Sequence, residues 1–218
     1  STLHVFIKSI NMGWDSFYIS HKLPSCIRSI DVLFKVTLAS VDMGIWLASA
    51  SERRSQILKD RFGDIFIKPL DDVDETHPNG SVSHKVLEIC KRKSEAVDFN
   101  HGFDFVIVAD TMIEDPDDFN SALGKPTDEL QATSMLLRLS GRRHKVWSAT
   151  GIQIAGDWTF FIESALVEFT ELTEEQIELL IKSKSWLGKA GAYDLAGMAG
   201  DYATLVDGDE LTVLGFAP

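Results

Sequence analysis

The sequence predicts an α/β domain built on a mixed sheet, beginning at about Gly44. Helical and strand-like segments interleave from this point, which is typical of α/β domains. The run 105–109 is continuous, apolar and rich in β-branched residues, as expected of a strand buried on both faces. The runs 145–154 and 158–169 flank Ala155-Gly156-Asp157, which predicts a hairpin and therefore some antiparallel pairing. Together these features indicate a mixed central sheet flanked by helices.

The first half of the domain is expected to alternate short strands with two helices. Residues 45–49 are typical of a short buried strand, and Ser51 is a candidate N-cap for a helix to about Phe62. A second strand is expected at 64–70. An acidic loop then leads to a helix over 82–97.

The second half is expected to begin with a polar loop that follows the buried apolar strand. Thr127 can cap a helix that ends near Leu139. Thr173 and Gln176 match a capping box at the start of the next helix. A glycine-rich segment and a short strand near 203–206 then close the domain.

Composition and charge exclude several classes of function. The net charge is −12, so we expect no binding to nucleic acid or to an anionic membrane. No apolar stretch approaches the roughly 20 residues that span a bilayer. Cys26 and Cys90 form no metal-binding pair and favour a reducing compartment, so a cytoplasmic protein is expected. Residues 1–43 keep neither the strand nor the helix period for long, and we expect an N-terminal appendage to the domain 44–218.

Lys93 lies on a helical face that is otherwise apolar. Val86, Cys90, Lys93 and Val97 follow the spacing i, i+4, i+7, i+11, which places them on one side of the predicted helix. A lysine on an inward face needs an anion, or it must extend its stem to solvent. Helix geometry leaves both interpretations open.

Asp110 is the first polar residue after the apolar run 105–109. Ligands of open α/β sheets bind beyond the carboxyl ends of the strands, so a carboxylate there can hold a divalent cation or accept a proton from water. The alternative is an aspartate that caps a turn or a helix, because Thr111 follows.

The acidic loop before the helix at 82–97 also has two interpretations. A run of carboxylates is commonly a solvated turn. One of them could instead join Asp110 in an oxygen-ligand site for magnesium or manganese, because substrate phosphates would supply the other ligands. The carboxylates of this loop are Asp71, Asp72, Asp74 and Glu75.

Three further cations suggest an anionic ligand. Arg53 and Arg54 fall in the first turn of a predicted helix, where the helix dipole disfavours cations and a bound anion would reverse the balance. They could alternatively pair with Glu52 or Asp60. Lys125 follows a glycine on a tight backbone and suits a phosphate oxygen. Proline follows this lysine, so the segment is not a Walker A loop.

Taken in order, seven segments resemble the Maf family of nucleotide pyrophosphatases across 44–218. The segments are LASASERR (47–54), DET (74–76), the helix ending in Lys93, ADT (109–111), GKP (124–126), LSGRRH (139–144) and GKAGAY (188–193). The resemblance implies two lobes around a cleft. It also implies hydrolysis of a nucleoside triphosphate between its α and β phosphates, with a divalent Mg²⁺ or Mn²⁺ ion.

The resemblance assigns roles to individual residues of this chain. It implies that Asp110 is the base that activates water, and that Glu75 and Asp110 hold the metal. Arg54, Lys93 and Lys125 would hold the phosphates. Such chemistry depends mainly on positioning and on neutralising charge in the transition state.

Substrate choice is implied at other positions. Ser51 begins the S-x-x-R signature of the family, and Arg53 and Thr111 match positions linked to substrate choice in the branch acting on dTTP and UTP. Three residues depart from the family pattern. Ser94 replaces an alanine after Lys93, a change expected to be harmless. Glu52 replaces a proline, and Ala196 replaces a glutamine associated with base recognition, which leaves the preferred base open.

A second hypothesis is a catalytically weak regulator of cell division that binds nucleotide without turnover. The resemblance also implies this role, because the family is associated with septum formation and cell division. The lost glutamine at Ala196 favours the regulator, whereas intact Asp110, Glu75 and Lys125 favour the enzyme. A homodimer is expected by analogy with the family alone.

Overall fold

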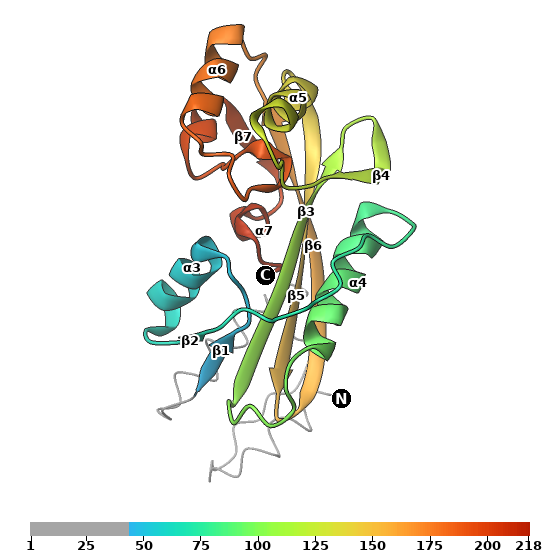
Figure 1. The fold of residues 1–218 in the computed structure, drawn as a ribbon, viewed down its shortest axis with the longest axis vertical. Coiled ribbons are helices and arrows are strands. Elements are labelled where there is room, and N and C mark those ends of the chain that lie inside the picture. Colours follow the sequence, from blue (N-terminus) through green and yellow to red (C-terminus); the bar gives the residue numbers. More distant parts are fainter. Residues whose placement is uncertain (1–43) are drawn as a thin grey trace, which may run out of the picture.

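The computed structural model describes residues 44–218, and the predicted appendage 1–43 lies outside the described residues. One seven-stranded sheet has the order β2-β1-β3-β5-β6-β7, with β4 paired to β3 (Figure 1). The strands are β1 (Ile45–Leu47), β2 (Phe66–Ile67), β3 (Phe105–Asp115), β4 (Asp118–Leu123), β5 (Arg143–Ile154), β6 (Asp157–Phe169) and β7 (Ala203–Asp207). β1 pairs in parallel with β2 and β3, and all other pairings are antiparallel. The predicted mixed sheet is therefore confirmed.

Helices cover the sheet in two groups. The helices are α3 (Glu52–Phe62), α4 (Val82–Glu95), α5 (Glu129–Leu139), α6 (Glu174–Lys182) and α7 (Glu210–Leu214), with 3₁₀ turns η1 (Ala190–Ala192) and η2 (Met198–Asp201). We call β1, α3, β2 and α4 the N-terminal lobe, and β4, α5, α6, η1, η2 and β7 the C-terminal lobe. The long strands β3, β5 and β6 run through both lobes (Figure 1). No helix within 44–218 is long and apolar enough to cross a membrane.

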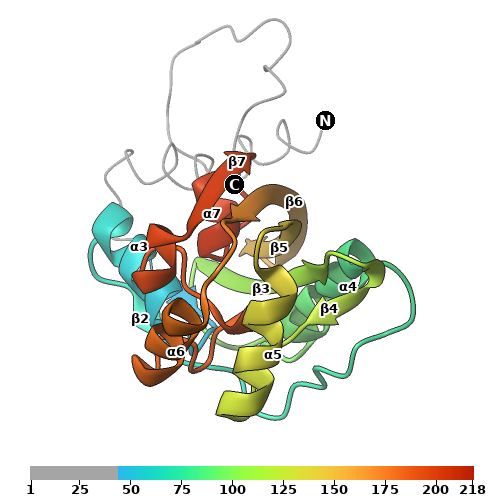
Figure 2. The same cartoon turned by 90° about the horizontal axis from the view of Figure 1, so that it is seen from above.

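The period-two alternation of β1 and β3 builds a core on each face of the sheet. Leu47 and Ile107 pack on one face with Leu58 of α3. Val106 and Val86 of α4 pack on the opposite face. Figure 2 shows the result, with α3 and α4 on opposite sides of the central strands. The sheet therefore positions both helices that carry candidate site residues. These residues are Arg53 and Arg54 in the first turn of α3 and Lys93 in α4.

A separate core holds the C-terminal lobe together. Leu136 and Leu139 of α5 pack with Phe169 of β6 and Leu180 of α6 in this cluster. Trp186 is also buried there, just before the glycine-rich segment. This core therefore supports that segment from behind.

One edge of β3 contains a gap that positions Asp110. β5 pairs with β3 from Phe105 to Ile113, but on the other edge β1 stops at Ile107 and β4 starts at Ile113. Within the described residues, no strand fills the space between them. The prediction that the strand ends at Asp110 was therefore wrong, because β3 continues to Asp115. The ligand-accessible end belongs to β1 instead, and Asp110 lies beside it.

Several local predictions are confirmed. Ser51 caps α3 and accepts a hydrogen bond from a first-turn backbone N–H. Thr173 and Gln176 form the predicted capping box of α6. Ala155 and Gly156 form the hairpin turn with φ values of 52° and 92°, as a two-residue turn between twisted strands requires.

Other local predictions need correction. The N-cap of α5 is Asp128 and not Thr127, because the Asp128 carboxylate accepts from the backbone N–H of Gln131 at 2.8 Å. The strand expected at 64–70 is reduced to the two residues of β2. β4 lies within the expected polar loop, and α7 was not predicted, because five residues are too few to show a helical period.

Candidate active site

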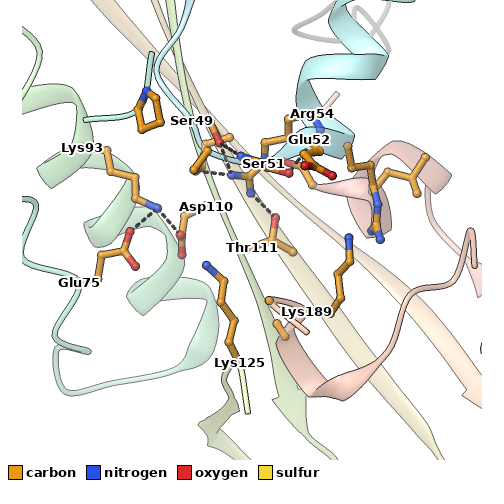
Figure 3. Close-up of a pocket in the computed structure, with 18 of the residues that line it drawn as sticks. Ser49, Ser51, Glu52, Arg54, Glu75, Lys93, Asp110, Thr111, Lys125 and Lys189 are labelled. Atoms are coloured by element: carbon orange, nitrogen blue, oxygen red, sulfur yellow. Dashed lines mark hydrogen bonds and ion pairs between the residues drawn. The ribbon is translucent and has the colours of Figure 1, made fainter. Parts of the chain in front are cut away.

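A pocket of about 780 Å³ lies between the two lobes, within the size range of small-molecule sites. Its walls come from the β1–α3 turn, the loop before α4, the gap in β3 and the segment 187–195. Eight predicted site residues line it: Ser51, Arg53, Arg54, Glu75, Lys93, Asp110, Thr111 and Lys125. The expected cleft between two lobes is therefore present, and tertiary folding brings the scattered charges together (Figure 3).

Lys93 connects two carboxylates at one end of this pocket. Its Nζ lies 2.7 Å from Asp110 Oδ1 and 2.9 Å from Glu75 Oε1. The lysine therefore meets anions on its inward side. We call Glu75, Lys93 and Asp110 the carboxylate end, and their formal charges sum to −1 when all three are ionised.

Glu75 differs from the acids beside it in the loop. Burial alone would raise the pKa of Glu75, but the hydrogen bond and charge of Lys93, with Lys125 and Arg54 nearby, bring this pKa below its ordinary value. Asp74 instead pairs with Arg92 at 3.3 Å on the surface. Glu75 is thus a pocket carboxylate held in its ionised form.

Lys125 offers a cation without a carboxylate partner. It makes no ion pair or hydrogen bond within residues 44–218 and lines the pocket. Figure 3 shows its side chain entering the pocket beside Asp110. The adjacent Gly124 is fixed because its carbonyl accepts a 3.0 Å hydrogen bond from the backbone N–H of Gly191. A ligand anion would find this ammonium group available.

Arg54 is buried and surrounded by neutral acceptors. Its Nε donates to Gly215 O at 2.8 Å, and its Nη1 donates to Ala109 O at 2.9 Å in the gap of β3. Nη1 also donates to Ser49 Oγ at 3.4 Å, and Nη2 donates to Thr111 Oγ1 at 2.9 Å. Gly215 has a φ of 117°, and a Cβ there would lie 2.9 Å from Arg54 Nε, so this contact requires glycine.

These contacts leave Arg54 with a positive charge that no carboxylate contacts within 44–218. Neither of the acids considered from sequence, Glu52 and Asp60, pairs with it; Asp60 accepts from Gln56 instead. Burial lowers the pKa of Arg54, which reflects the cost of a desolvated cation. Four N–H donors are used and one on Nη2 remains. An anion in the pocket would offset this buried charge.

The hydroxyl of Thr111 is restricted to accepting hydrogen bonds from a ligand. Ser148 donates its only proton to Thr212 O at 2.7 Å. The 2.8 Å contact between Thr111 and Ser148 must therefore use the Thr111 proton. Because Arg54 also donates to this oxygen, its remaining capacity is as an acceptor.

The other end of the pocket has the opposite charge balance. Asp194 forms ion pairs with Arg53 and, at 3.2 Å, with Lys189. We call Arg53, Lys189 and Asp194 the basic end, with a formal sum of +1. Sequence reasoning missed Lys189 and Asp194. The available signal was the glycine-rich segment, whose backbone and Tyr193 alone suggest close approach to a flat ligand.

Ala196 does not line the pocket among residues 44–218. It is exposed in the turn after Asp194 and donates its backbone N–H to Asp194 Oδ1 at 3.0 Å. Its position therefore does not place its methyl group against a ligand in the pocket. In this turn, Asp194 is the residue whose side chain contacts the pocket cations Arg53 and Lys189.

A buried hydrogen bond anchors the glycine-rich segment from behind. His144 Nε2 lies 2.8 Å from the hydroxyl of Tyr193, a pocket residue. Burial lowers the pKa of His144 to about 4, so the ring is neutral at physiological pH. Phe169 packs edge-on against Tyr193. These contacts hold the residue just before Asp194 in place.

The fold and pocket define a mixed α/β protein with cations and carboxylates interleaved between two lobes. The model of the family described as Maf-like protein matches residues 44–217. The chain therefore belongs to the Maf-like family. The resemblance seen in the seven sequence segments is thus confirmed.

Curated relatives agree with this assignment. The chain is 37% identical over 179 residues to a dTTP/UTP pyrophosphatase of Clostridium novyi, covering 79% of this chain and 91% of the relative. It is 33% identical over 171 residues to a dTTP/UTP pyrophosphatase of Pyrococcus abyssi, covering 78% and 89%. Among solved structures, the Ham1 protein of Staphylococcus aureus aligns at a TM-score of 0.41 and 15% identity, covering 64% of this chain and 97% of that chain.

Proposed function

We propose that this chain hydrolyses nucleoside triphosphates of the dTTP and UTP type to the nucleoside monophosphate and pyrophosphate. The observation that carries the proposal is the carboxylate end, where Lys93 joins Asp110 and Glu75 in a pocket that also holds Lys125. Cations and carboxylates in this arrangement suit a polyphosphate with a divalent cation. The names of the relatives supply the substrate class.

The carboxylate end fits a divalent metal ion. Glu75 and Asp110 contact the same amino group, so their oxygens face a common region, and their combined charge with Lys93 is negative. No group of three His, Cys, Asp or Glu residues within 44–218 could hold a metal by itself. Phosphate oxygens and water would therefore complete the coordination of Mg²⁺ or Mn²⁺. When bound, the ion would neutralise phosphate charge during displacement.

The residues of the chain would divide the remaining work. Asp110 would accept the proton of the attacking water, and Lys93 orients its carboxylate through the 2.7 Å contact. Lys125 would bind a phosphate oxygen directly. Arg54 would stabilise phosphate charge with its remaining N–H while its four fixed contacts keep the pocket wall in shape.

Pyrophosphate release from a panel of nucleoside triphosphates with Mg²⁺ or Mn²⁺ tests the proposal. We expect the highest kcat/KM for UTP and dTTP, and loss of turnover when the metal is chelated. Calorimetric binding of the same nucleotides should run alongside. Binding without pyrophosphate release for any base would reject the enzyme and leave the nucleotide-binding regulator.

A further inference from the structure

We propose that Asp194 is a positioning residue for base recognition. It would hold Arg53 and Lys189 as N–H donors for the carbonyl oxygens of a pyrimidine, and keep both cations from turning to the phosphates. The inference rests on the proposed function, because it concerns the substrate end opposite the reacting phosphates. It assigns a role to a carboxylate that does not itself line the pocket among residues 44–218.

The geometry shows one carboxylate shared by two pocket cations from different lobes. Arg53 belongs to the first turn of α3, whereas Lys189 and Asp194 belong to the segment 187–195. The side chains of Arg53 and Asp194 are 19% and 18% exposed, so solvent screens their ion pair only in part. Asp194 is itself fixed by the backbone N–H of Ala196.

The shared carboxylate changes what the two cations can bind. Within 44–218, the polar side-chain contact of Arg53 is with Asp194, so its other N–H groups remain for a ligand. Burial opposes ionisation of Asp194, but Arg53 and Lys189 bring its pKa below the ordinary value. The ionised acid offsets positive charge while leaving directed donors. Such donors suit neutral carbonyl oxygens better than a tetra-anionic phosphate chain.

The surroundings of the basic end also favour a base over phosphates. Leu187, Ala190 and Leu195 of the segment 187–195 line the pocket. Ile113, which lies against Gly191, and its β5 partner Val146 line it as well. A flat ring needs apolar walls with a few placed polar groups. Asp194 would repel phosphates, whereas Lys125, which enters the pocket beside Asp110, makes no ion pair within 44–218. The phosphates are therefore assigned to Lys125 and the base to Arg53.

This arrangement predicts a chemical preference. Uracil and thymine present carbonyl oxygens at two ring positions, which can accept from Arg53 and Lys189. Cytosine presents an amino group in place of one carbonyl, and its N–H donors would face other donors. A site built to satisfy particular hydrogen bonds rejects an analogue that leaves them unpaired. Asp194 enforces this choice by keeping the two cations in place.

The test compares UTP with CTP in wild type, Asp194→Ala, Asp194→Asn and Asp194→Glu. In Asp194→Ala we expect the ratio of kcat/KM for UTP over CTP to fall about tenfold, the size of one charged hydrogen bond. The kcat for UTP should stay within about threefold, because the carboxylate end is untouched. Glutamate should restore part of the ratio, and asparagine should restore less because it lacks the charge.

Asp201→Ala is the matched control. It removes one exposed carboxylate from η2 in the same lobe and should keep the wild-type ratio. Arg53→Ala supplies the reference for a lost base contact. An Asp194→Ala ratio equal to wild type would overturn the inference. An equal fall in kcat for both nucleotides would also overturn it, because that result describes general loss of structure.

Calorimetry with UMP and CMP separates this inference from the proposed function, because binding needs no turnover. If wild type releases no pyrophosphate yet prefers UMP, and Asp194→Ala loses that preference, the proposed hydrolysis fails and the inference stands. If wild type binds both monophosphates equally, the inference fails whatever the turnover. Tighter binding of inorganic pyrophosphate by Asp194→Ala would support the inference, because Arg53 and Lys189 would then be free to turn toward phosphate. Unchanged pyrophosphate affinity would count against it.

Discussion

The two ends of the pocket use the same kinds of side chain in opposite proportions. At the carboxylate end, Lys93 serves both Glu75 and Asp110. At the basic end, the single carboxylate of Asp194 serves Arg53 and Lys189. The formal charges of the first three residues sum to −1, and those of the second three sum to +1. The difference gives the pocket a direction along which an asymmetric ligand would align.

The two ends of the pocket differ in their structural support. The carboxylate end rests on α4 and the gap in β3, within the N-terminal half of the sheet. The basic end joins the start of α3 to the segment 187–195, which His144 anchors through Tyr193. Substitutions and pH should therefore affect the two ends separately.

The largest expected effect comes from Asp110→Asn. An asparagine keeps the shape but cannot accept the proton of water, so kcat should fall about a thousandfold. Affinity for UTP should change only a few fold, because the basic end and Lys125 are intact. Pyrophosphate release and calorimetric binding measure the two quantities. Asp157→Asn in the exposed hairpin is the control. Near-normal turnover of Asp110→Asn would show that Asp110 is not the general base.

As pH falls, the stabilising contribution of His144, which anchors the segment of the basic end, should be lost before that of Glu75 at the carboxylate end. His144 has a folded pKa of about 4 against an ordinary 6.5, so the unfolded chain takes up a proton first as pH falls. The free energy of unfolding should therefore decrease from pH 6.5 toward pH 4, by about 3 kcal/mol. Glu75 has a lowered pKa, so its contribution is present above 4.5 and is lost only as pH falls through the lowered value.

Urea unfolding between pH 7 and pH 4 measures this dependence. His144→Gln should be less stable at pH 7 yet show a flatter pH profile, because its side chain does not titrate. A variant profile as steep as that of wild type would assign the pH dependence to other groups.

A smaller effect is expected from Glu75→Gln. Loss of one carboxylate from the proposed metal site should raise the Mn²⁺ concentration for half-maximal activity by about tenfold. Asp74→Asn provides a matched control from the same loop, since Asp74 pairs with Arg92 outside the pocket. Metal titrations of pyrophosphate release distinguish the two variants. Equal shifts in both would indicate a general effect of loop charge.

The smallest effect is expected from Ala196→Gln. The position is exposed and outside the pocket lining within 44–218, so restoring a glutamine should change the UTP to CTP ratio only about twofold. The same panel measures it. A tenfold gain would show that the turn moves into the pocket when a longer side chain is present.

Features governed by local rules were predictable from the sequence. Ser51 and the pair Thr173 and Gln176 identify helix starts through neighbouring backbone groups. Lys93 followed from the helical period of its neighbours. The position of the Asp128 cap was missed by one residue, because two adjacent side chains could both serve.

Features that depend on distant partners were not predictable. Arg54 binds the carbonyl of Gly215, which is 161 residues away, so its neutral surroundings cannot be read from its own segment. β4 has little apolar alternation and is fixed by pairing with β3. Asp194 gains its importance only when folding brings Arg53 beside it. The amino-acid sequence contains these residues but does not show which of them contact one another in the folded protein.

The gap in β3 also bears on how the protein avoids aggregation. Open backbone groups along a strand are a template for pairing with another molecule. Here the stretch of β3 without a neighbouring strand lies between β1 and β4, and the carbonyl of Ala109 within it accepts a hydrogen bond from the guanidinium of Arg54. An arginine thus takes the place of a neighbouring strand. The protein can keep a polar cavity open within its sheet without offering that edge to another chain.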